Sequence, residues 1–158
     1  MEGQVPMTPE GNARLKEELK TLRDIERPKI SREIGVAREH GDLKENAEYH
    51  AAKERQGWIE ARIKDLEDKL SRAEVIDPSK LSGSKIAFGA TVKLSNVDTE
   101  EEVVYRLIGP DEANLDQGSI SSTSPLARAL IGKEVGDEVK VRMPAGERIY
   151  EVLEVAYR

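Results

Sequence analysis

The chain has 158 residues, of which 35% are charged and 37% hydrophobic, and its net charge is -6. This acidity argues against direct binding of a polyanion, because few counterions would be released, and the lack of cysteine excludes disulfides, zinc fingers and thiol chemistry. The first residues lack the basic and apolar regions of a signal peptide, and no apolar run reaches membrane-spanning length. We therefore expect a cytoplasmic protein with no membrane partner.

A long helix is predicted from about Thr8, whose hydroxyl caps it, to Glu39. Its apolar residues follow helical spacing, but Ile30 comes eight residues after Leu22 where seven would keep the seam in phase. We attribute this shift to a bend at Pro28, because an interior proline removes one backbone hydrogen bond.

A second helix is predicted to end near Glu74, with apolar residues at coiled-coil spacing and charges between them. Two helices joined by a short connection must lie antiparallel. We therefore expect residues 1–76 to form a long helical hairpin, a coiled coil, with an acidic tip at residues 39–48.

The second half of the chain changes from helical to alternating apolar spacing. Residues 77–84 are rich in Pro, Ser and Gly and predict a linker, and residues 85–158 predict a small domain. Ser124 and Pro125 open a compact helix that Gly132 ends. Strands are predicted at residues 90–97, 101–109, 119–122, 137–143 and 148–157. The expected fold class is α+β, with an antiparallel sheet and one short helix in this domain.

Four acids spaced three residues apart surround Gly41: Glu39, Asp42, Glu45 and Glu48. Two interpretations remain open. In the structural one, Asp42 caps the second helix and Glu45 is the reciprocal acid of a capping box. In the chemical one, Asp42 and Glu45 form an incomplete Mg²⁺ site. Such a site is weak alone, because Mg²⁺ takes only one or two carboxylates and completes its shell with water and phosphate oxygens.

Several ordered segments together carry a family resemblance. The tip region reads AREHGDLKENAEYHAAKERQG, and it is followed by RIKDLEDKL in the second helix. Further matches run along nearly the whole chain: PMTPEG, VIDPSK, FGATV, SPLARALIGK and PAGE. The sequence resembles the GreA/GreB family of bacterial transcript cleavage factors.

The resemblance implies an FKBP-like fold for residues 85–158, which would dock at the mouth of the secondary channel of bacterial RNA polymerase. The hairpin would reach down that channel to the active centre. There the polymerase would cut backtracked RNA near its 3′ end in a Mg²⁺-dependent reaction, and elongation would resume. The protein is thus expected to be a cofactor of the polymerase and not itself an enzyme.

The same resemblance assigns residues to roles. Asp42 and Glu45 match the acids that help hold the second Mg²⁺, shared with the polymerase, and position the attacking water. Arg38 and Lys44 are candidates for contacts with RNA phosphate or polymerase acids. Candidates for docking on the polymerase lie in the second domain: Ser124, Pro125 and Arg128.

The remaining expectations concern partners and alternatives. DNA would be contacted only indirectly, through the elongation complex, and the free protein would be a monomer. One alternative is a structural adaptor in which the tip acids serve only as helix caps. Another is a channel-blocking inhibitor that slows nucleotide addition without producing RNA fragments.

Overall fold

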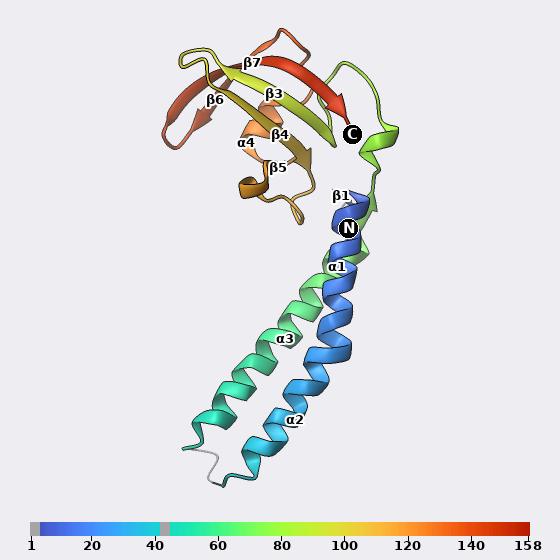
Figure 1. Ribbon diagram of the computed structural model, residues 1–158, viewed down its shortest axis with the longest axis vertical. Helices are drawn as coiled ribbons and strands as arrows, with labels where there is room; N and C mark the ends of the chain where they lie inside the picture. The colour runs from blue at the N-terminus through green and yellow to red at the C-terminus, as the bar shows by residue number, and fades with distance from the viewer. Residues whose placement is uncertain (1–3, 42–44) are drawn as a thin grey trace. The chain divides into compact units, whose positions relative to one another are not determined.

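The computed structural model describes residues 4–41 and 45–158, which form two compact units (Figure 1). One unit, Asn12–Arg72, is built on helices. The other joins the described residues up to Gly11 with Ala73–Arg158 and contains the strands. The predicted α+β class is therefore confirmed. Within the described residues, no helix is both long enough and apolar enough to cross a bilayer.

The helical unit consists of two antiparallel arms (Figure 1). The first arm runs through α1 (Pro9–Thr21), the π-helix η1 (Leu22–Glu26) and α2 (Arg27–Arg38), and the second arm is α3 (Ala47–Arg72). With 26 residues, α3 is about 39 Å long. The arms bury one apolar seam between them, made of Leu15, Leu19, Leu22, Ile30, Ile34, Ala37, Ala52, Ile59, Ile63 and Leu66.

The phase shift in the first arm has a different cause from the predicted bend at Pro28. In η1 the amide of Arg27 donates to the carbonyl of Leu22, five residues back. This wider turn absorbs one extra residue, so both Leu22 and Ile30 remain buried although they are eight residues apart. Pro28 then lies at the start of α2, a position that tolerates proline.

Two bidentate ion pairs fix the register of the arms. Arg62 donates to the Glu18 carboxylate at 2.7 and 2.9 Å, and Arg27 donates to Glu60 at 2.8 Å through two nitrogens. The hydrogen bond from the Arg62 guanidinium lowers the pKa of Glu18. Such fork-to-fork geometry adds directional specificity that a single charge contact lacks. The arms are thus held in one register by charge pairs beside their apolar seam.

The sheet of the second unit has the strand order β5-β4-β3-β7-β6. Its elements are β3 (Ala90–Asn96), β4 (Glu102–Ile108), β5 (Ser119–Ser121), α4 (Pro125–Leu130), β6 (Glu138–Met143) and β7 (Gly146–Tyr157). The prediction of a wholly antiparallel sheet is wrong at one edge, where β5 pairs with β4 in parallel. A 3₁₀ turn at Leu115–Gln117 lies in the connection that brings β5 back in the same direction as β4.

The core of this unit lies between the sheet and α4. Leu126, Ala127 and Leu130 of α4 are buried against alternate residues of the central strands, such as Val92 and Leu94. The period of two in β3 therefore turns one face of that strand to the core, as the sequence pattern predicted.

A short parallel pair of strands was not predicted. β1 (Val5–Met7) pairs with β2 (Ala73–Val75), which follows α3 directly. After β1, Thr8 caps α1 as expected, because its hydroxyl oxygen accepts from the amide of Gly11 at 3.1 Å. These strands therefore meet where the first arm begins and the second ends.

The turn between β3 and β4 contains a strained residue. Glu100 has a φ of 64°, and it is the one non-glycine residue with positive φ in the described ranges. Because a side chain in this conformation costs about 1 kcal/mol, Glu100→Gly is expected to raise the free energy of unfolding by about 0.5 kcal/mol after the entropy gained by the unfolded glycine is subtracted. Urea denaturation measures this change. Glu101→Gly is the control and should lower stability, so a loss in both variants would contradict the assignment of strain.

Candidate functional site at the acidic tip

The first arm ends close to the acidic tip (residues 39–48). α2 stops at Arg38, and Gly41 takes a φ of 108° while its amide donates to the Arg38 carbonyl at 3.4 Å. That φ favours glycine because it has no Cβ. Two predicted site residues, Asp42 and Lys44, lie outside the described residues.

The second arm is capped by Asn46, so Glu45 is not the reciprocal acid of this cap, and the part of the structural interpretation that concerns Asp42 lies outside the described residues. α3 begins at Ala47, and the side-chain oxygen of Asn46 accepts from the amide of Tyr49 at 3.0 Å. Glu45 precedes this cap and therefore stands outside the helix.

Sequence reasoning missed Asn46, although the signal was available. Asparagine is among the most favoured N-cap residues, and Asn46 stands directly before a long helical pattern. Its side-chain nitrogen also donates to the Ala37 carbonyl at 2.6 Å, near the end of α2. One amide side chain thus bonds both the end of the first arm and the start of the second.

Glu45 lies exposed beside a shallow depression of about 470 Å³. The lining residues are His40, Glu45, Asn46, Ala47 and Glu48. His40 approaches Glu48 with a distance of 3.9 Å between its Nε2 and the carboxylate, so these two side chains face each other at the ends of the arms. Within residues 4–41 and 45–158, the Glu45 carboxylate forms no ion pair with a basic side chain.

The donors at this site suit Mg²⁺ only in part. Carboxylate oxygens are the ligands that Mg²⁺ prefers, and one or two of them are usual in a site completed by water and phosphate. Glu45 supplies one exposed carboxylate. Among the described residues, no group of three or more His, Asp or Glu side chains is placed to hold a metal ion. The described part of the tip thus offers one carboxylate ligand, Glu45, to a metal site that another molecule would complete.

Arg38 lies at the end of α2 and reaches across to the second arm. Its guanidinium carbon is 5.9 Å from the centre of the Tyr49 ring, a distance at which a cation is attracted to an aromatic face. The side chain is exposed. Arg38 is thus placed beside the same cap as Glu45, in a position to meet an anion brought to the tip.

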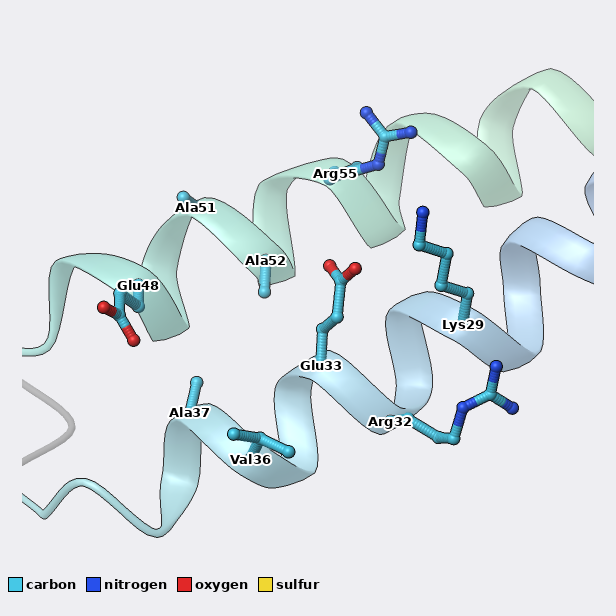
Figure 2. Close-up of a pocket in the computed structure, with 9 residues that line it drawn as sticks. All are labelled: Lys29, Arg32, Glu33, Val36, Ala37, Glu48, Ala51, Ala52 and Arg55. Carbon is cyan, nitrogen blue, oxygen red and sulfur yellow. The ribbon is translucent and has the colours of Figure 1, made fainter.

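Further along the arms, a depression of about 560 Å³ opens between α2 and α3. Figure 2 shows its floor of small side chains, with Ala52 directed from α3 toward α2. Where isoleucine and leucine fill the seam elsewhere, alanine here leaves space between the helices. The lining residues are Lys29, Arg32, Glu33, Val36, Ala37, Glu48, Ala51, Ala52 and Arg55, so charges of both signs surround an apolar floor.

The candidates for docking lie on α4, in the other unit. Ser124 caps this helix as predicted, since its hydroxyl oxygen accepts from the Ala127 amide at 3.2 Å. Pro125 and Arg128 are exposed, and Arg128 donates to the Thr123 carbonyl at 2.8 Å. The helix therefore presents an outer face while its apolar side chains are buried; contact with a polymerase stays a prediction.

Together these features define an α+β protein of two units: in one, two long antiparallel helical arms carry an exposed acid at one end, and the other is built on a mixed sheet. Two family models match the chain: "Transcription elongation factor, N-terminal" over residues 5–75 and "Transcription elongation factor, GreA/GreB, C-term" over residues 81–157. The chain belongs to the GreA/GreB family of transcription elongation factors.

Individual relatives agree over almost the full chain. The sequence is 62% identical to transcription elongation factor GreA of Hyphomonas neptunium over 98% of both chains. It is 55% identical to the GreA of Thermodesulfovibrio yellowstonii over 99% of both. Among solved structures, the GreA factor homolog 1 (Gfh1) of Thermus thermophilus is 33% identical and covers 97% of this chain and 99% of its own, with a TM-score of 0.44.

Proposed function

We propose that the protein binds RNA polymerase and stimulates the polymerase to cleave backtracked RNA, by presenting Asp42 and Glu45 at the acidic tip. The observation that carries this proposal is the exposed carboxylate of Glu45 directly beside the Asn46 cap, at the end of two long paired helices. Membership in the GreA/GreB family supports RNA polymerase as the partner. Insertion into the secondary channel would need a long helical projection, and the pairing of the first arm with α3, a helix of 26 residues, supports this part of the proposal.

The acids would act by completing a metal site that the polymerase begins. A second Mg²⁺, when bound, activates the attacking water in two-metal phosphodiester hydrolysis. Asp42 and Glu45 would each offer carboxylate oxygens to it, while the polymerase and the RNA phosphate supply the rest. Because the protein alone offers so few ligands, it would hold the ion weakly when free. Its acids would also repel bare phosphate, so they act only where metal is already concentrated.

The second unit, whose fold we take to be FKBP-like, would dock on the polymerase. Its candidate contacts are Ser124, Pro125 and Arg128, because the outer face of α4 is exposed while its inner face is buried in the core. Arg38 and Lys44 would pair with RNA phosphate or polymerase acids near the tip. The free protein would be a cytoplasmic monomer, and DNA would be met only through the elongation complex.

Cleavage of backtracked RNA by the wild-type protein tests this function. Complexes are stalled and backtracked with RNA labelled at its 3′ end, and the protein is added with Mg²⁺. We expect short 3′ fragments to appear faster than by the polymerase alone, followed by renewed elongation. The protein incubated with RNA and Mg²⁺ without polymerase is the control and should release nothing. Fragments in that control, or no acceleration with polymerase, would overturn the proposal.

The two alternatives give other results in the same assay. A channel-blocking inhibitor would slow nucleotide addition and release no fragments. A structural adaptor would bind the polymerase without altering either rate, and neutralising its tip acids would change only the melting temperature, because acids near the start of a helix favour its dipole.

A further inference from the structure

The side chain of Asn46 bonds a backbone group at the end of one arm and a backbone group at the start of the other. Its oxygen accepts from the Tyr49 amide in the first turn of α3, and its nitrogen donates to the Ala37 carbonyl in the last turn of α2. The Tyr49 amide lies in the first turn of α3, where no partner exists within the helix itself. The Ala37 carbonyl also accepts from the His40 amide at 3.2 Å. Asn46 thus supplies the partner of the Tyr49 amide and adds a second donor, from the other arm, to the Ala37 carbonyl.

This bridge lies next to the predicted catalytic acid. Glu45 is joined to Asn46 by a single peptide bond, and the side chain of Asn46 is half-buried while that of Glu45 is exposed. The bridge also closes the arms at the level where alanines leave the inter-helical seam loosely filled. Apolar packing therefore holds the two arms together only weakly here, and the hydrogen bond from Asn46 to Ala37 contributes more to keeping their ends in place.

We propose that Asn46 is a positioning residue, which holds the ends of the two arms together and thereby sets the place of Glu45 for RNA cleavage. This inference rests on the proposed function. Capping alone does not require asparagine, because aspartate and serine cap equally well. The donated bond to Ala37 does require it. An aspartate has no proton to donate at neutral pH, and a serine hydroxyl is shorter and already aimed at the Tyr49 amide.

Substitution separates the two bonds. Asn46→Asp and Asn46→Ser keep the cap on α3 and lose the bridge to α2, whereas Asn46→Ala loses both. With Asp or Ser at position 46, the maximum rate of cleavage is expected to fall about tenfold, as when groups supporting a metal ligand are removed, while the affinity for polymerase and the melting temperature change little. Only Asn46→Ala should also melt the first turn of α3, seen as faster hydrogen exchange of the Tyr49 amide.

A structural measurement checks the same inference without RNA cleavage. The chain has no cysteine, so spin labels can be placed at Val36 and Ala51, which are exposed on α2 and α3. The distribution of distances between the labels is expected to broaden in Asn46→Asp. Asn114→Asp is the matched control, because the side chain of Asn114 also accepts from a backbone amide, that of Asp116, but caps a 3₁₀ turn in the other unit. It should leave both the distances and the cleavage rate unchanged.

The outcomes distinguish this inference from the function on which it rests. Full cleavage by Asn46→Asp, with an unchanged distance distribution, would overturn the role of Asn46 even if the tip acids prove essential. Full cleavage by Glu45→Gln would instead overturn the proposed function. A rate loss in Asn46→Ala alone would reduce Asn46 to a helix cap and likewise contradict the inference.

Discussion

Replacing Glu45 by glutamine is expected to lower the rate of polymerase-dependent RNA cleavage about 100-fold, the usual loss when one preorganised electrostatic group is removed from a reacting centre. Glutamine has nearly the same shape but no charge, so it is a poor ligand for Mg²⁺. Binding to the polymerase should be almost unchanged, because docking is assigned to the other unit. The measurement is the single-turnover rate of cleavage at saturating protein, together with a separate binding titration.

Glu48→Gln is the matched control for this prediction. Glu48 is also an exposed acid of the tip, but it lies in the first turn of α3 and faces His40. Its charge helps the helix dipole by a few tenths of a kcal/mol, so cleavage should stay close to the wild-type rate. Asp42→Asn should behave like Glu45→Gln. Equal losses for Glu45→Gln and Glu48→Gln would mean that the total charge of the tip matters and no particular carboxylate.

The parts of the fold that local chemistry specifies were predictable from the sequence. Thr8 caps α1 and Ser124 caps α4. Both caps were predictable because a hydroxyl residue directly before a proline is a local signal for the start of a helix. The strands of the sheet followed from alternation of apolar residues, which is a property of each strand by itself. The location of the acids between two helical arms was equally local.

What sequence reasoning missed depends on partners distant in the chain. The parallel pairing of β1 with β2 joins residues about 70 positions apart, and three-residue strands carry almost no alternation signal. The eight-residue spacing between Leu22 and Ile30 fits a π-helix and a proline bend equally well, so the sequence alone could not distinguish them. At the tip, the acids suggested a cap at Asp42, in one of the two interpretations that the sequence left open. The bond from Asn46 to Ala37 forms only when the two arms meet, so no local pattern could reveal it.

Glu112→Ala is expected to lower the free energy of unfolding of the sheet-containing unit by about 3 kcal/mol. Glu112 is buried, with 8% of its surface exposed. Its carboxylate accepts from the Thr8 amide at 2.8 Å, from the Gly109 amide at 3.1 Å and from the Thr8 hydroxyl. Removing it leaves buried donors without partners, and each such donor costs more than the bond itself contributed. Hydrogen exchange of amides in β3 and β7 measures the loss.

An exposed acid in the same region gives the matched control. Asp116 lies in the 3₁₀ turn that follows this loop, and Asp116→Ala should change stability by less than about 0.5 kcal/mol, as is usual for surface substitutions. Glu112→Gln should fall between the two, since an amide keeps one acceptor but turns donors toward the Thr8 hydroxyl. Equal stability of Glu112→Ala and Asp116→Ala would contradict the account.

The contact between Glu112 and Gly11 allows a sharper test of the same carboxylate. A Cβ built at Gly11 would overlap the Glu112 carboxylate, which three hydrogen bonds hold in place, so Gly11→Ala alone should destabilise the unit. In the Glu112→Ala background that overlap is largely removed, and alanine is favoured over glycine within a helix. Gly11→Ala should therefore cost much less there. Strictly additive losses in the double variant would show that the Glu112 side chain does not occupy this position.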